Sequence, residues 1–461
     1  MGAEADAPLP TEYFIIRPKK IRLIDILSLL ILRKSLSSYK FVETSGTDKD
    51  GLRADWVTAL TLLIMKVLDK IKVPLKWTGI IVEFLFNLLA LNGGVRKLVI
   101  PKRDSADFRS VIAFVDARQD LYKNNSLLHY FPLMEPQGGF DGINLLDLTA
   151  MAAKIVYENP AYIENTVTNH WKFLEEKTTQ AFIFCNKAED ADLIVLSFRG
   201  TEPFNAEDWS TDVNLSTLLA GKLGLLHLGF LKAIGLQNET NFILGFPNEI
   251  EMNADKPFAY YILRQELRNL LAKHKNAKII VTGHSLGGAL SAVFPALLSY
   301  HNQNDILNSM HSVMNYGQPR VGDAIFKSYV NVLMRVKYQR MVYRYDIVPR
   351  IPFDLPPLSN FKHCGKCIYF DGWYKGKLVD EVPNPNYFLE PQYAPRMYLS
   401  AWGDLFRAFF IGYTAGKDFK EGTVSILFRL TGLVLPGIAC HSPRDYVNSV
   451  RLAKIENTLF V

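Results

Sequence analysis

Short apolar runs alternate with helical patterns from about residue 140 to residue 345. The runs Ala181–Cys185 and Leu193–Phe198 are separated by polar residues, which is typical of neighbouring strands. Phe258–Lys273 places apolar residues at helical spacing. Helices are also predicted at Leu145–Tyr157, in the stretch that ends at Tyr300, and near Phe326–Val336. Strands are predicted at His311–Tyr316 and Arg340–Tyr345. Alternating strands and helices predict an α/β fold with a mostly parallel sheet.

Three apolar stretches precede this pattern, at Ile21–Leu32, Trp56–Leu68 and Gly79–Leu91. None reaches the roughly 20 uninterrupted apolar residues that span a bilayer. They fit helices in a lipid interface, a re-entrant hairpin, or helices packed on the main domain. We expect residues 1–100 to form a helical region that associates with a membrane or lipid droplet, and residues 101–461 to form the main domain.

The alternation stops at about residue 355, where Pro, Gly and Tyr become frequent. Two apolar stretches, Leu405–Tyr413 and Val424–Gly437, lie within this part. We interpret residues 355–440 as an insertion between the last strands of the sheet. Asp445–Ile455 is predicted to close the chain as a helix.

The segment Lys278–Ala289 joins a β-branched run to Gly-x-Ser-x-Gly and a helix start rich in small residues. This is the context of a nucleophile elbow, a sharp turn that lifts a Ser hydroxyl above the end of a sheet. Gly283 and Gly287 lack the Cβ atoms that would clash there. Ser285 is therefore the candidate nucleophile, and the N–H of Leu286 can face an oxyanion. The alternative, a chance motif in a loop, does not explain the flanking strand and helix.

A serine nucleophile needs a base and a carboxylate that orients it. In elbow enzymes the order along the chain is Ser, then Asp or Glu, then His. Asp346 ends a predicted strand and is the favoured carboxylate, ahead of Asp323 in a helix-start cap and Asp354 in a Pro-rich loop. The histidines after Asp346 are His363 and His441. His441 is favoured because it lies in a loop before the final helix.

His363 adjoins the pair Cys364 and Cys367. One Cys-x-x-Cys pair with a single adjacent His falls short of a zinc site, so we expect no metal and no other cofactor. These residues are predicted to lie at a strand edge.

The second oxyanion donor must follow another strand, and Leu193–Phe198 is followed by Arg-Gly-Thr201. Thr201 offers both an N–H and a hydroxyl. The next segment, Glu202 to Leu228, mixes polar residues with Trp209 and the apolar run Leu215–Leu226. It suits a lid over the site, with an ordinary surface helix as the alternative.

The composition sets bounds on the class of protein. About half of the 461 residues are hydrophobic, which excludes global disorder. A net charge of +6 is weak evidence for nucleic-acid binding and is compatible with binding to an anionic membrane surface. Four cysteines are too few for a disulfide scaffold and fit a reducing compartment. The N-terminus has neither a secretory pattern nor the myristoylation pattern, because Asp6 replaces Ser or Thr.

Together these motifs resemble the class 3 lipases, an α/β-hydrolase family. The matching pieces, in order, are Phe198–Thr201, Trp209, Asp212, His227–Phe230, Gly283–Gly288, Tyr316–Gly322, Asp346–Pro349 and His441. The resemblance implies Ser285, Asp346 and His441 as the triad, Thr201 and Leu286 as oxyanion donors, and a lid from just after Thr201 that includes Trp209 and Asp212. The long insertion stretches the interval between the Asp and the His, so the base is less firmly placed than the nucleophile.

The apolar N-terminal region and the insertion depart from the compact fungal members and resemble plant oil-body lipases. That resemblance implies an intracellular triacylglycerol lipase at the surface of lipid droplets, with the ER membrane as an alternative location. The expected partners are an acylglycerol and a lipid surface, not nucleic acid; the oligomeric state is left open. A phospholipase or galactolipase with the same chemistry, and a non-catalytic lipase-like scaffold, are the rival functions.

Overall fold

A computed structural model describes residues 12–32, 35–45, 56–92, 99–122, 144–176, 181–235, 247–250, 258–334, 337–353, 360–385, 387 and 390–455. The candidate Asp354 and the expected start of the insertion at residue 355 lie outside these residues.

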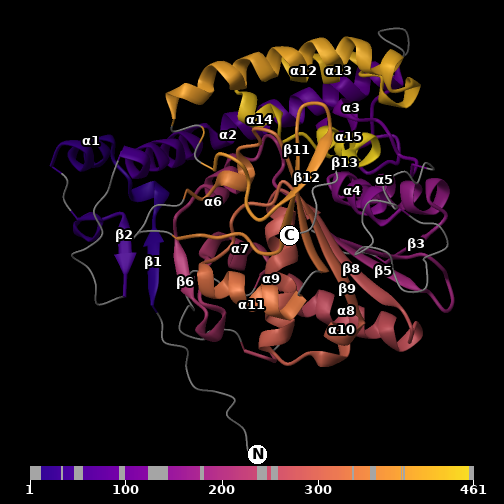
Figure 1. Cartoon of the computed structure of the whole chain (residues 1–461), viewed down its shortest axis with the longest axis horizontal. Coiled ribbons are helices and arrows are strands. Elements are labelled where there is room, and N and C mark those ends of the chain that lie inside the picture. Colours follow the sequence, from indigo (N-terminus) through magenta and orange to yellow (C-terminus); the bar gives the residue numbers. More distant parts are fainter. Residues whose placement is uncertain are drawn as a thin grey trace, which may run out of the picture.

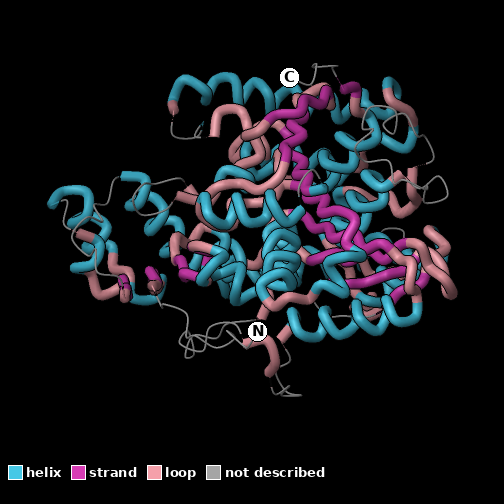
Figure 2. Tube along the Cα trace, turned by 60° about the horizontal axis from the view of Figure 1, so that its bottom comes forward, coloured by secondary structure: helices cyan, strands magenta, loops and turns pink. Residues whose placement is uncertain are grey.

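A nine-stranded sheet forms the centre of the molecule (Figures 1 and 2). Its five central strands, β5, β8, β9, β10 and β11, run parallel to one another, which confirms the predicted sheet. In spatial order the strands are β13 (Lys454–Ile455), β12 (Lys375–Val379), β11 (Lys366–Phe370), β10 (Tyr338–Tyr343), β9 (Met310–Tyr316), β8 (Lys278–His284), β5 (Leu193–Phe198), β4 (Ala181–Cys185) and β3 (Leu174–Glu176).

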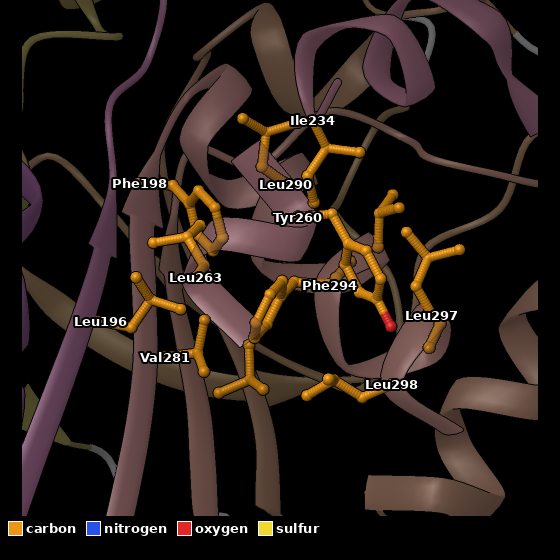
Figure 3. Close-up of a cluster of buried hydrophobic side chains, with 14 of the residues drawn as sticks. Leu196, Phe198, Ile234, Tyr260, Leu263, Val281, Leu290, Phe294, Leu297 and Leu298 are labelled. Carbon is orange, nitrogen blue, oxygen red and sulfur yellow. The ribbon is translucent and has the colours of Figure 1, made fainter. Parts of the chain in front are cut away.

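Helices cover both faces of this sheet, because its strands are apolar on both sides. One face packs on α8 (Ala259–Lys273), α9 (Leu286–Tyr300) and α11 (Ala324–Met334). Figure 3 shows Leu196, Phe198 and Val281 of the strands against Leu290 and Phe294 of α9. The other face packs on helices from both ends of the catalytic region, namely α4 (Leu145–Ile155), α5 (Pro160–Asn165) and α15 (Pro443–Leu452).

The N-terminal residues build a second, four-stranded antiparallel sheet together with the middle of the chain. Its order is β2 (Val42–Thr44), β1 (Tyr13–Ile16), β6 (Thr217–Leu219) and β7 (Leu225–His227). The N-terminal region is therefore joined to the rest of the fold by strand pairing, in addition to the contacts of its helices.

The N-terminal helices are α1 (Leu23–Leu32) and α2 (Trp56–Leu91). The two apolar stretches Trp56–Leu68 and Gly79–Leu91 are one continuous helix, which passes through Pro74. The charged segment between them separates two apolar runs in the sequence but keeps a helical backbone. Among the described residues, α2 is the one helix long and apolar enough to cross a membrane by length and composition, and 11% of its apolar window is buried.

The insertion begins with two strands, β11 and β12, that extend the central sheet. It continues as three helices: α12 (Ala394–Thr414), α13 (Thr423–Thr431) and α14 (Pro436–Ala439). Helices α12 and α13 lie along one edge of the molecule (Figure 1). The final helix α15 ends at Leu452 rather than Ile455, because residues 454 and 455 pair with β12. Other short helices are α3 (Val111–Val115), α7 (Leu228–Ala233) and α10 (Asn304–Ser309).

Candidate active site

Ser285 lies on the sharp turn between β8 and α9, as the motif predicts. Its backbone has φ 60° and ψ −130°, a conformation that side-chain-bearing residues rarely adopt. A Cβ on Gly283 would overlap the backbone of Gly287, and a Cβ on Gly287 would overlap the carbonyl oxygen of Phe198. Both glycines are therefore required for β5, β8 and α9 to approach this closely.

Asp346 and His441 lie 95 residues apart in the sequence and are brought together by the fold. Asp346 follows β10, and His441 follows α14. The His441 ring nitrogen Nδ1 lies 2.7 Å from Asp346 Oδ2. Asp346 is fully buried and accepts two more hydrogen bonds, from the Tyr446 hydroxyl at 2.5 Å and from the Val348 N–H at 2.9 Å. These donors offset the cost of removing a carboxylate from water.

Two buried polar atoms of this site have no hydrogen-bond partner, the Ser285 hydroxyl oxygen and His441 Nε2. Buried polar atoms are nearly always paired unless function requires otherwise. With Nδ1 engaged by Asp346, Nε2 is the nitrogen of His441 that is free to exchange a proton. An imidazole held in this tautomer is the usual partner of a serine nucleophile.

His284 packs against one face of the His441 ring. The two imidazoles stack with centroids 4.4 Å apart, and His284 Nε2 lies 3.0 Å from the carbonyl oxygen of His441. Because a carbonyl can only accept, His284 carries its proton on Nε2, and Nδ1 accepts from the Tyr157 hydroxyl at 2.8 Å. Burial, and then the proximity of His441, lowers the pKa of His284 well below its ordinary value. His284 is therefore neutral and holds the His441 loop rather than acting as a base.

Thr201 and Leu286 lie on the two segments expected to form an oxyanion hole. In the described part of the chain, neither backbone N–H has a hydrogen-bond partner. The Thr201 hydroxyl does not face the site, because it donates to Asp212 Oδ2 at 2.7 Å. Burial raises the pKa of Asp212 to about 8, so this carboxyl is protonated at neutral pH.

The segment expected to be a lid divides into two different parts. The first is the helix α6 (Ala206–Asp212), whose Trp209 ring lies edge-on to His441 with centroids 6.3 Å apart. The second is the apolar run Leu215–Leu226, which contains β6 and most of β7. Its leucines at 215, 218, 223 and 226 are buried in the core, so this part is not a mobile apolar cover. Burial of these leucines in the core, beside the paired strand β1, accounts for its apolar character.

A cavity of about 520 Å³ opens beside Leu286. Its walls come from β1, α2, α6 and α7. Ile15 and Ile16 of β1 and Asp69 and Lys72 in the middle of α2 thus help to shape the space next to the nucleophile turn, although they precede it by about 200 residues or more.

The competing candidates have other environments. His363 is fully buried, and its Nε2 lies 2.6 Å from the carbonyl oxygen of Pro349. Asp323 accepts from the Phe326 N–H at 2.9 Å, which is the cap that its position predicts. The described residues contain no cluster of three His, Cys, Asp or Glu side chains that could hold a metal ion.

The cysteines beside His363 are also structural. Cys364 and Cys367 pack into two different apolar clusters. Burial raises the pKa of the Cys364 thiol to about 12, which keeps it protonated and unreactive.

The chain is similar to known lipases. Residues 195–355 match the family described as Lipase (class 3). The chain is 37% identical to triacylglycerol lipase OBL1 from Nicotiana tabacum, covering 90% of this chain and 86% of that protein. It is 36% identical to triacylglycerol lipase OBL1 from Arabidopsis thaliana, covering 98% of this chain and 96% of that protein.

This chain belongs to the class 3 lipase family. As a class 3 lipase it is a carboxylic ester hydrolase with an α/β-hydrolase fold. Among solved structures, lipase II from Rhizopus niveus is 23% identical and covers 48% of this chain and 76% of its own, with a TM-score of 0.35.

Two members of the site could not be recognised in the sequence of this class 3 lipase. Tyr446 follows His441 by five residues within a predicted helix, where a tyrosine resembles an ordinary core residue. Tyr157 lies at the end of a predicted helix far from the motif, and its contact with His284 depends on the packing of α4 against β8. His284 precedes Asp346, so the expected order of Ser, Asp and His excludes it as the base, and chain order cannot reveal a supporting role.

Proposed function

We propose that this class 3 lipase hydrolyses triacylglycerols, and the diacylglycerols and monoacylglycerols derived from them, with Ser285, His441 and Asp346 as its catalytic triad. The observation that carries the proposal is the His441–Asp346 pair beside a nucleophile turn, with the two unpaired atoms Ser285 Oγ and His441 Nε2 in one buried site. The relatives that match nearly the whole chain bear the name triacylglycerol lipase.

In the proposed mechanism, His441 Nε2 accepts the proton of Ser285 as its oxygen attacks the ester carbonyl. The resulting imidazolium is stabilised by Asp346, whose charge is held in place by Tyr446 and Val348. The tetrahedral oxyanion accepts hydrogen bonds from the N–H groups of Thr201 and Leu286. His441 then protonates the leaving alcohol, and water releases the fatty acid from the acyl-enzyme. No step needs a metal or cofactor.

The Thr201–Asp212 bond gives α6 a role in this mechanism. Asp212 anchors the loop that carries one oxyanion donor, and Trp209 of the same helix lies beside His441. We therefore assign α6, rather than the whole segment after Thr201, as the cover of the site. Movement of α6 would alter the oxyanion loop and the surroundings of the base together.

The proposed place of action is the surface of a lipid droplet. Apolar side chains on α1 and α2 face outward, including Ile24 at 66% exposure and Ile31 at 76%. Such faces suit helices that lie in the boundary between headgroups and acyl chains. Residues 1–100 are thus proposed to act as a lipid-associating region, while β1 within them also pairs with β6.

The decisive experiment replaces Ser285 with Ala and measures the release of fatty acid from a triolein emulsion. Loss of at least about a thousandfold in rate is expected, because the nucleophile is removed. Ser299→Ala, near the far end of the helix α9 that follows Ser285, is the matched control and should retain activity. Hydrolysis by Ser285→Ala at nearly the wild-type rate would refute the assignment, and failure of the wild type to react with a fluorophosphonate probe would favour a scaffold. Parallel assays on phosphatidylcholine and a galactolipid identify the preferred headgroup.

A second experiment tests the N-terminal region without removing β1. The double variant Ile24→Ser, Ile31→Ser should float less with triolein droplets, because two exposed apolar side chains become polar. Ile325→Ser, an exposed residue on α11, is the control and should float as the wild type does. Unchanged flotation of the double variant would show that α1 does not contact lipid.

A further inference from the structure

Beyond the first turn of α12, the charged side chains of α12 and α13 point into the protein. On α12, Asp404 is buried and pairs with Arg344 at 2.5 Å and with Arg407 at 2.9 Å. On α13, Arg429 is buried and pairs with Asp445 at 2.6 Å. Each ion pair lies on the side of the helix that faces the rest of the fold.

The outward side of the same helices is apolar. On α12 the exposed side chains recur every three or four residues, so they form one stripe: Leu399, Trp402, Phe406, Phe409, Phe410 and Tyr413. Leu427 and Leu430 of α13 continue this surface. A helix on the surface of a water-soluble protein has the opposite arrangement, with its apolar side toward the core. We refer to this surface of α12 and α13 as the insertion face.

We propose that the insertion face is a second lipid-contact surface, which inserts into the headgroup–acyl boundary of a phospholipid-coated droplet or membrane. The choice of lipid as the partner rests on the proposed function. The exposed residues that define the insertion face are different from those of the lipid-associating region proposed for residues 1–100.

The distribution of charge around the insertion face supports a lipid surface. From Met397 to Ala415 the charged side chains are Asp404 and Arg407, and both are turned inward. Exposed basic residues stand at the two ends of α12, Arg396 before the stripe and Lys417 and Lys420 after it, with Asp418 as the exposed acid among them. Basic residues around an apolar, aromatic-rich centre fit anionic headgroups around acyl chains.

The insertion face also leads toward the catalytic base. It continues into α14, where Ile438 is exposed three residues before the candidate base His441. Helix α13 packs on α3, and α3 packs on α2, so the face is connected to the N-terminal helices through one short element. Figure 1 shows α12 and α13 along the edge of the molecule that also carries α14. Lipid held on this face would therefore lie close to the His441 loop.

The first test uses the full-length chain and the double variant Phe406→Ser, Phe410→Ser. Partition to vesicles of phosphatidylcholine with an anionic phospholipid should weaken by about tenfold or more, because two largely exposed aromatic rings no longer enter the bilayer. Hydrolysis of a water-soluble short-chain ester should stay at the wild-type level, since neither residue contacts the triad. Trp373→Ser, a still more exposed aromatic on the β11–β12 turn, is the control and should bind vesicles as the wild type does.

The second test reports contact directly and does not depend on loss of binding. The native cysteines that the chain contains are buried, so Tyr413→Cys can be labelled with bimane at one exposed position. Its emission should shift to the blue when vesicles are added, and the same label on Trp373→Cys should not shift. Both measurements are repeated in Ser285→Ala, so a failure of the proposed hydrolysis cannot be mistaken for a failure of lipid contact.

Two results would overturn the inference. One is a bimane label at position 413 that stays water-exposed while the protein is bound to vesicles. The other is normal vesicle binding by the double variant together with conversion of a wild-type dimer to a monomer in light scattering, which would assign the insertion face to a second copy of the chain.

Discussion

The buried carboxyl of Asp212 makes a quantitative prediction about stability and pH. Burial is the main reason that its pKa is raised to about 8, against an ordinary value of 3.8. Between these two values the folded chain keeps the proton and the unfolded chain does not. Unfolding therefore releases a proton, and a rise in pH through this window lowers the free energy of unfolding. The contribution of Asp212 to the free energy of unfolding is fully present below pH 3.8. It decreases as the pH rises and is lost once the pH has passed about 8.

The magnitude follows from the two pKa values. One proton is worth about 1.4 kcal/mol for each pH unit inside the window. Between about pH 5.5 and pH 7.5 the free energy of unfolding should fall by roughly 2–3 kcal/mol through Asp212 alone. In Asp212→Asn the neutral amide still accepts the Thr201 hydroxyl but has no proton to lose, so this part of the pH dependence should vanish.

The assay is urea denaturation followed by tryptophan fluorescence at several pH values, for the wild type, Asp212→Asn and the surface control Asp305→Asn. The pH slope of Asp305→Asn should match the wild type. A constant difference in stability between Asp212→Asn and the wild type at every pH would refute the reasoning, because it would mean that Asp212 has the same charge in the folded and unfolded chains.

Three further changes test other parts of the fold. Tyr446→Phe removes one hydrogen bond to Asp346, so kcat on a soluble ester should fall about tenfold with little change in KM, and an unchanged kcat would show that Tyr446 does not position the carboxylate. Gly287→Ala places a Cβ against the Phe198 carbonyl, so thermal scanning should show a large loss of stability; an unchanged Tm would contradict the close packing of β5 on α9. Arg429→Met removes the nearest positive charge from the buried Glu421 and Asp445, which keep only longer ion pairs with Arg444 and Arg407, and should lower the free energy of unfolding by about 3–5 kcal/mol. Equal stability in urea would mean that the Arg429 pairs are not needed.

The elements around Ser285 could be predicted from the sequence because several local signals coincide there. A β-branched run, two glycines and a small-residue helix start fall within 12 positions, and each is short-range. Strands such as β4 and β5 were predictable for the same reason, since their apolar runs are bounded by polar residues. The parallel sheet followed from the alternation of strands with helices.

Contacts between distant segments were harder to predict. The order of Ser, Asp and His narrowed the base to two histidines, but only packing shows that His441 meets Asp346 and that His363 meets a backbone carbonyl. The run Leu215–Leu226 was expected in a lid because its apolar character is visible, while its partner β1, about 200 residues earlier, is not. The sequence pattern predicts two separate apolar stretches where the structure has the single helix α2. A charged interval with Pro74 interrupts the apolar pattern without ending the helix.

The pairing of β1 with β6 also fixes the order in which parts of this protein can form during translation. Phe14 pairs with Thr217, so β1 has no partner on that side until more than 200 further residues have been made. At about 5–20 residues per second, that interval is about 10–40 s. Once Leu91 has been made, the apolar sequence of α1 and α2 is present for the rest of this interval, whereas Ser285 and His441 are not. The lipid contact proposed for α1 and α2 therefore does not require a formed active site.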